Sequence, residues 1–143
     1  MFLKSNPNNL DQLRSHFSNL CQLALADAII NKQEAEYLEG LCTQYGISRA
    51  EFDEIMNDAY SIEFVSPETP LERLEQMYDL VRMVLMDDLI DERKVQLCVK
   101  VAKNLGFGPH IVGDLIKALV TVNEDTGKDD LEEDDLKTIL SFG

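Results

Sequence analysis

The sequence predicts an all-α fold of about seven helices in one compact domain, built from two pseudo-symmetric repeats of three helices each. Apolar residues recur at spacings of three and four, as at Leu38, Leu41, Cys42 and Tyr45, which is typical of amphipathic helices. No segment alternates apolar and polar residues cleanly enough to predict a β-strand. The third observation is an internal repeat.

The repeat relates residues 20–56 to residues 80–116 without gaps. Each segment has 20 apolar positions, and 18 of them coincide. Random placement would give about eleven coincidences, so the register indicates a duplication. Asp27 and Asp87 form one of the five identical pairs. Three helices of this length cannot cover their own apolar faces, so we expect the two repeats to pack together.

Residues that begin or end helices separate the expected elements. Gly46 and Gly106 follow the last apolar residue of a helix, where a left-handed cap favours glycine. Ser48 and Glu51 have the spacing of a capping box that opens the third helix. The expected helices occupy about residues 9–29, 32–45, 48–58, 70–87, 92–105, 109–121 and 130–141.

The later elements follow from similar signals. Residues 61–70 contain two prolines and predict an extended crossover between the repeats. Pro109 lies where the sixth helix is expected to begin, and its fixed φ suits a first turn. Asp129 or Asp130 is expected to cap an acidic C-terminal helix over about residues 130–141. Three apolar residues of that helix are expected to face inward: Leu136, Ile139 and Leu140.

Length and composition favour a soluble, cytoplasmic protein with a single domain over residues 1–143. The chain is long enough to bury a core, and 45% of its residues are hydrophobic. The first residues lack the apolar stretch of a signal peptide, and no run approaches the roughly 20 apolar residues that span a bilayer.

The formal net charge of −14 restricts the expected partners. Nucleic-acid backbones are repelled, because proteins bind them through basic groups that displace counterions. Anionic membranes are disfavoured for the same reason, so we expect neither nucleic acid binding nor membrane insertion. Basic protein surfaces and metal cations are the partners that this charge attracts.

The residues that commonly carry catalysis show no catalytic pattern. Cys21, Cys42 and Cys98 lie within apolar patterns without metal-binding spacing, so we expect reduced, structural cysteines. His16 and His110 are expected to be solvated or to cap helices. The sequence contains no nucleophile elbow, no phosphate-binding glycine loop and no His-Glu-x-x-His motif. We therefore expect a protein that is not an enzyme.

The two helix corners read ALADAIINKQE, residues 24–34, and VLMDDLIDERK, residues 84–94. In these corners the chain resembles the TerB-like family, whose repeats carry an Ala-x-Ala-Asp-Gly-x-Ile/Val-x-x-x-Glu motif. The first corner matches at Ala24, Ala26, Asp27, Ile30 and Glu34, and the second at Asp87, Ile90 and Asp91. Ala28 and Asp88 replace the family glycine, and Lys94 replaces the glutamate.

The resemblance implies an all-helical, non-catalytic protein related to the stress response and to tellurite resistance. It also implies metal chelation by the acidic corners. The same domain is the N-terminal domain of a membrane-anchored DnaJ-like co-chaperone, which implies a role in recognition. The corner residues that would hold the metal are Asp27, Glu34, Asp87, Asp88 and Asp91.

The chemistry of the corners leaves two interpretations open. Asp27 and Asp87 are expected near the negative end of a long helix, where a cation, a basic side chain or backbone N–H groups would offset their charge. Several carboxylates within a few residues favour a hard cation such as Ca²⁺ or Mg²⁺. Alternatively, Asn31 and Asp91 are N-caps, Glu34 completes a capping box, and Lys94 neutralises the second corner.

The acidic C-terminal region offers a second surface. Eight of residues 124–135 are acidic, but an EF-hand is excluded because Val122 would occupy the first ligand position. These acids are expected to interact favourably with the positive end of the dipole of the last helix, or to form a docking surface for a basic partner. The sequence therefore leaves two functions: a module that binds a divalent cation at its corners, or an adaptor that docks a basic protein without metal.

Overall fold

The computed structural model of the chain describes residues 10–26, 30–86, 89–128 and 130–142. Every regular element in these ranges is helical, which confirms the predicted all-α class. The elements are α1 (Leu10–Ala24), α2 (Lys32–Tyr45), α3 (Arg49–Asp58), the short 3₁₀ helix η2 (Ala59–Ser61), α4 (Pro70–Val84), α5 (Glu92–Asn104), α6 (His110–Thr126) and α7 (Glu133–Phe142). No helix of the described residues is long and apolar enough to cross a bilayer.

Local cap chemistry explains several of these boundaries. Asn31 caps α2 and Ser48 caps α3, each in a complete capping box with the glutamate three residues later. Gly46 ends α2 with φ of 74°, a left-handed conformation that costs glycine little. Gly106 has φ of 89° just after α5. The predictions for these four positions are confirmed.

Two helices end earlier than the sequence predicts. α1 ends at Ala24 instead of residue 29, and α4 ends at Val84 instead of residue 87. Both ends tighten in the same way, since the N–H of Ala26 bonds the carbonyl three residues earlier, as does the N–H of Met86. The apolar pattern continues through these turns, so periodicity alone placed the ends too late.

The C-terminal elements also differ from the prediction. α6 continues to Thr126 and is capped by Gly127, with φ of 74°, whereas its end was expected at residue 121. α7 begins at Glu133, so the predicted cap at Asp130 is wrong. Instead, the N–H of Glu132 bonds the carboxylate of Asp135 over 2.8 Å. The inward face was predicted correctly, because Leu136 is fully buried and Ile139 and Leu140 pack on the core.

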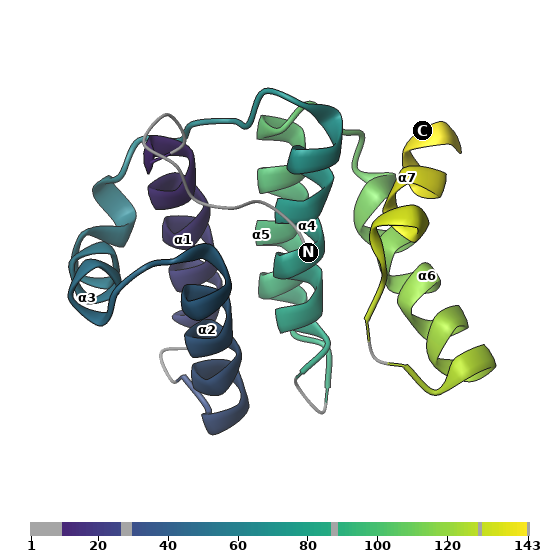
Figure 1. Cartoon of the computed structure of the whole chain (residues 1–143), viewed down its shortest axis with the longest axis horizontal. Coiled ribbons are helices and arrows are strands. Elements are labelled where there is room, and N and C mark those ends of the chain that lie inside the picture. The colour runs from purple at the N-terminus through teal and green to yellow at the C-terminus, as the bar shows by residue number, and fades with distance from the viewer. Residues whose placement is uncertain (1–9, 27–29, 87–88, 129, 143) are drawn as a thin grey trace.

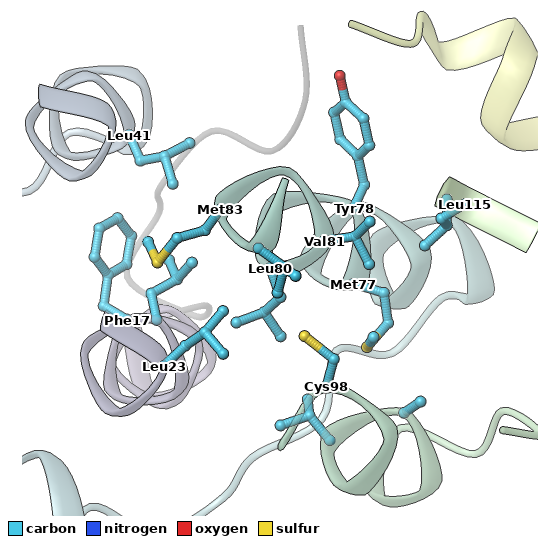
Figure 2. Packing of buried hydrophobic residues seen from close by; sticks show 14 of the residues in the cluster. Phe17, Leu23, Leu41, Met77, Tyr78, Leu80, Val81, Met83, Cys98 and Leu115 are labelled. Atoms are coloured by element: carbon cyan, nitrogen blue, oxygen red, sulfur yellow. The ribbon is translucent and has the colours of Figure 1, made fainter. Parts of the chain in front are cut away.

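α4 lies at the centre of the helical arrangement, with α1 on one side and α6 and α7 on the other (Figure 1). α5 runs beside α4 and also contacts α1, while α2 and α3 pack on α1. Figure 2 shows Met77, Leu80 and Met83 of α4 among side chains from α1, α2, α5 and α6. The buried apolar residues of all seven α-helices thus form one cluster around α4.

The crossover from η2 to α4, residues 62–69, forms no helix or strand, and the backbone is extended at both of its ends, Ile62 and Thr69. Two buried serines of α1 fix its course. The hydroxyl of Ser15 accepts a 2.8 Å hydrogen bond from the N–H of Val65, and the hydroxyl of Ser18 donates to the carbonyl of Ala59 over 2.6 Å. Phe64 packs partly against the core. These two hydrogen bonds fix η2 and the crossover against α1.

Candidate functional site

Glu34, a predicted metal ligand, lies in a buried ion pair. Its Oε2 is 2.7 Å from Nζ of Lys94, and both side chains are fully buried. Its other oxygen accepts the backbone N–H of Asn31 over 3.1 Å, which closes the capping box of α2. Lys94 therefore neutralises a carboxylate of the first corner, and its charge also helps to lower the pKa of Asp91 in the second corner. Buried carboxylates need such a partner, because the cost of desolvating an isolated charge is large.

Asp91, the predicted ligand in the second corner, caps α5. Its carboxylate accepts the backbone N–H of Arg93 over 2.9 Å and the Nη2 of the same arginine over 2.9 Å. The side-chain and backbone hydrogen bonds from Arg93 lower the pKa of this carboxyl below its usual value. Asp91 therefore has the role that the capping interpretation predicts.

The other three predicted ligands, Asp27, Asp87 and Asp88, lie outside the described residues. Within the described ranges, no group of three or more His, Cys, Asp or Glu side chains could hold a metal ion. Both described predicted ligands, Glu34 and Asp91, pair with basic side chains, an arrangement that does not suit a cation ligand.

A second buried polar cluster joins α1, α2 and α4. The carboxylate of Asp79 accepts the hydroxyl of Tyr45 over 2.7 Å, and its Oδ2 is 2.8 Å from Nε2 of His16. The backbone carbonyl of Asp79 accepts the hydroxyl of Tyr37 over 3.0 Å. Burial, followed by the charge of Asp79, raises the pKa of both tyrosines well above the usual value, so both remain hydrogen-bond donors.

Three side chains of this cluster are buried: His16 is 0% exposed, Tyr45 1% and Asp79 2%. The tautomer of His16 with hydrogen on Nε2 donates to Asp79 and leaves a lone pair at Nδ1, which has no hydrogen-bond partner among the described residues. The arrangement fixes three helices, and within it Tyr37 is only half-buried.

The prediction of a solvated or capping role for His16 is wrong. The residue occupies the apolar face of α1, with Leu13 and Phe17 at helical spacing and both buried. That position was the available signal for burial. The partner Asp79 lies 63 residues away, so no local pattern could identify it. His110, in contrast, is exposed and lies 3.9 Å from the carboxylate of Asp114, four residues later.

The three cysteines are free, as predicted. Burial raises the pKa of the thiols of Cys21 and Cys98 to about 12 and that of Cys42 to about 11. Thiolates are the reactive form, so these cysteines are poor nucleophiles.

An open groove lies between α2 and the C-terminal half of the chain. It consists of two clefts of about 750 Å³ and 860 Å³, which share Glu36, Tyr37 and Arg82. The first cleft runs between α2, α4 and residues 130–133, and the second between α2, the end of α4 and α6. The face of α2 that lines them is formed by Gln33, Glu36, Tyr37, Gly40, Leu41 and Gln44. We call this feature the acidic groove.

Carboxylates surround the acidic groove. Its exposed acids come from α2, α6 and the start of α7: Glu36, Glu124, Asp130, Glu132 and Glu133. Glu132 and Glu133 also face Lys128 and Lys137 at 3.4 and 3.5 Å, in exposed pairs of the kind that contribute little. Apolar side chains line its other part: Leu85, Met86, Leu119 and Val120, the last being 47% exposed. The groove therefore combines a negative rim with an apolar wall.

Gly40 keeps the first cleft open. A Cβ atom added at this residue would meet no heavy atom within 4 Å, and the residue is exposed on α2. A larger side chain here would project into the cleft. The glycine weakens the helix slightly, since glycine inside a helix costs about 0.5–1 kcal/mol relative to alanine.

Arg82 is the basic residue of the groove lining. Its guanidinium lies 5.4 Å from the ring centroid of Tyr37 and 5.8 Å from that of Tyr78. Both rings are themselves fixed, because Tyr37 donates to the carbonyl of Asp79 and the hydroxyl of Tyr78 accepts the N–H of Leu131 over 2.8 Å. In Figure 2 the ring of Tyr78 points away from the core toward the C-terminal segment. The guanidinium thus lies near two aromatic rings that are each fixed by a hydrogen bond.

No known relative guides the choice of function. No family model, curated protein or solved structure matches the chain. The acidic groove and the corners are therefore the features of the chain that bear on its function.

Proposed function

We propose that this protein is a non-catalytic interaction module whose acidic groove binds a basic, amphipathic helix of a partner protein. The proposal is supported chiefly by one observation: five exposed carboxylates surround a groove that also has an apolar wall. Helix-in-groove recognition needs an apolar wall for the apolar face of the ligand. The carboxylates attract lysines and arginines on its opposite edges.

The net charge of −14 supports the same choice, because it steers basic partners toward the protein. The two clefts adjoin along the same face of α2, so one continuous ligand can contact both. The absence of an accessible titratable cluster at His16 and Asp79 favours recognition over catalysis. The partner is therefore defined by its chemistry: a helical segment with leucine-like residues on one face and lysine or arginine on the other.

A synthetic amphipathic helix of leucine and lysine, labelled with a fluorophore, tests this proposal. Binding is measured by fluorescence anisotropy. Gly40→Leu should weaken binding about tenfold or more, because the new side chain fills the first cleft without changing the charge of the protein. Gly113→Leu is the matched control: this glycine also lies in a helix with open space around it, and it lines neither cleft.

The contribution of charge is tested separately. Glu36→Gln should weaken the same peptide about two- to fivefold, because Glu36 borders both clefts. Glu54→Gln removes the same charge from α3, away from the groove, and should leave binding nearly unchanged. Equal losses in Glu36→Gln and Glu54→Gln, with no loss in Gly40→Leu, would mean that the peptide binds through net charge, and the proposed groove would be wrong.

Cation binding at the corners is the second hypothesis that the sequence raised. The remaining predicted ligands are Asp27, Asp87 and Asp88, since Glu34 and Asp91 already have basic partners. A cation that binds the folded state raises the melting temperature by mass action. If Ca²⁺ or Mg²⁺ produces such a rise and Asp87→Asn abolishes it, the corner binds metal. A melting temperature indifferent to both ions would end that hypothesis.

The duplication of the chain is also a proposal, and the positions of its elements support it. α1 and α4 begin and end 60 residues apart, and α2 and α5 begin 60 residues apart. The buried partners Glu34 and Lys94 are themselves separated by 60 residues. Equivalent positions of two repeats meet in this way when they face each other across a twofold axis. The TerB-like resemblance rests on the same corners.

A further inference from the structure

The guanidinium of Arg82 has an arrangement that a purely cation-binding groove would not require. Among the described residues it makes no hydrogen bond or ion pair, although five exposed carboxylates line the same groove. It is the basic residue shared by both clefts, and it lies half-buried near their junction. An arginine in acidic surroundings usually pairs with a neighbouring carboxylate, so its position calls for another explanation.

The two tyrosines provide that explanation. Aromatic rings close to a guanidinium attract its charge without using its N–H groups, which remain available to a hydrogen-bond acceptor. Tyr37 and Tyr78 are each held by a hydrogen bond, so Arg82 is already ordered before any ligand arrives. An ordered guanidinium binds a planar carboxylate with two parallel hydrogen bonds and loses little side-chain entropy.

We propose that the acidic groove recognises a carboxylate at Arg82, so that its partner helix carries one acidic group among its basic residues. This inference rests on the proposed function, since it adds a requirement to the same ligand. The surrounding acids exclude ligands that are anionic overall, because like charges repel. They also disfavour a phosphate group, which carries nearly two charges. The ligand that fits is basic overall and has a single carboxylate near its centre.

The test combines two peptides with two proteins. The peptides are leucine–lysine amphipathic helices that differ at one central position, which is glutamate or glutamine. The wild-type protein should bind the glutamate peptide about tenfold more tightly than the glutamine peptide, as expected for one charge-assisted pair. In Arg82→Gln the preference should disappear. The glutamine peptide should bind this variant as tightly as the wild type or more tightly, because the groove has lost a positive charge.

In Arg82→Gln, the affinity for the glutamate peptide should fall while that for the glutamine peptide stays the same or rises. This difference separates recognition by Arg82 from a purely structural role. If Arg82 only supported the fold, Arg82→Gln would weaken both peptides alike. Arg82→Lys keeps the positive charge but loses the two parallel N–H donors of the guanidinium. It should therefore retain only part of the preference for the glutamate peptide. A third peptide with central phosphoserine should bind the wild type no better than the glutamine peptide. A fourth, with its only carboxylate at the C-terminus, distinguishes a terminal from a side-chain carboxylate.

The two proposals fail in different ways. If neither peptide responds to Gly40→Leu, the groove does not bind helices and the proposed function is wrong. If both peptides respond to Gly40→Leu but wild type binds them equally, the groove binds basic helices and the role of Arg82 is wrong. A preference for glutamate that persists in Arg82→Gln would also overturn the inference.

Discussion

The buried pair of Glu34 and Lys94 is the residue-scale feature with the largest expected effect on stability. Both side chains are fully buried, and their atoms approach to 2.7 Å. Glu34→Gln keeps the acceptor for the capping box but removes the negative charge beside Lys94. Removing one partner of a buried pair leaves the other charge poorly compensated, so the free energy of unfolding should fall by about 3–5 kcal/mol.

Urea unfolding measures this loss of stability, and a double variant tests whether it comes from the unpaired charge of Lys94. Glu34→Gln combined with Lys94→Met removes both charges, so most of the stability should return, since apolar replacements of buried pairs are often nearly neutral. Strict additivity of the two single losses would contradict the assignment of the pair.

Glu75 of α4 makes the stability depend on pH. It is 3% exposed, and its pKa is raised from 4.5 to about 7 by burial, then by the charges of Asp79, Glu133 and Glu72. The folded state therefore holds the proton more tightly than the unfolded state. The sign follows from linkage: this group favours folding at low pH, and its contribution is lost as the pH rises from 4.5 through about 7.

Glu75→Gln removes this titration. Urea unfolding should show the variant more stable than the wild type by about 1–3 kcal/mol near pH 8, with the difference disappearing near about pH 4. Glu54→Gln, an exposed residue of α3, is the control and should not change the pH dependence. A wild-type excess of stability at about pH 8 would contradict the raised pKa.

The candidate site shows which residue roles a sequence can supply. Glu34 and Asp91 were predicted metal ligands, and their capping roles were the alternative that the sequence left open, because caps act within a few positions. The bond between His16 and Asp79 joins residues 63 positions apart, so neither residue carries a local sign of the other. Arg82 was missed for the same reason, since its two tyrosines come from different helices.

At the scale of single elements, two glycines of α2 have opposite effects. Gly46 has φ of 74° at the helix end, and Gly40 lies inside the helix with open space around it. Gly46→Ala should reduce the free energy of unfolding by about 1–2 kcal/mol, because alanine is strained in the left-handed region. Gly40→Ala should increase it by about 0.5–1 kcal/mol, because alanine loses less entropy in a helix.

Thermal melts of the two variants check both signs in one helix. Melting temperatures that shift in the same direction would show that the caps do not set the stability of α2.

Helix starts were predicted better than helix ends, and the reason is physical. A start depends on a side chain that bonds the first free N–H groups, as Ser48 does for α3. An end is decided by where tertiary packing stops, and the apolar pattern of α1 and α4 continues into the turns that follow. Gly127 was a local signal for the end of α6 that was given too little weight. The groove depends on the relative placement of α2, α4 and α6, which no local signal fixes.

At the scale of the whole molecule, the excess of acids has a local consequence. The sequence has 27 acidic and 13 basic residues, and an exposed acid away from the groove, Asp53, pairs with Arg49 of the same helix α3. In the groove lining, by contrast, five exposed acids accompany a single arginine. The negative electrostatic potential is therefore concentrated in the groove, because walls of low dielectric constant focus the electric field of the carboxylates.

The contacts between the two halves of the chain predict that neither half folds alone. Dividing the chain after Ser66 would separate Glu34 from Lys94 and His16 from Asp79, and would expose the face of α1 that packs on α4 and α5. Each fragment would then retain buried polar groups without partners, at a cost that small helical units cannot offset. The cut itself breaks neither of the hydrogen bonds beside it. Val65 stays bonded to Ser15 in the first fragment, and the carbonyl of Pro67 stays bonded to Arg73 in the second.

Circular dichroism of residues 1–66 and residues 67–143 tests this expectation. Each fragment alone should show weak helicity and no cooperative melt. An equimolar mixture should recover helicity and elute as one species, because the shared core around α4 re-forms. A cooperative melt of either fragment by itself would show two independent domains, and the pairs at Glu34 and Asp79 would then be contacts between domains instead of parts of one core.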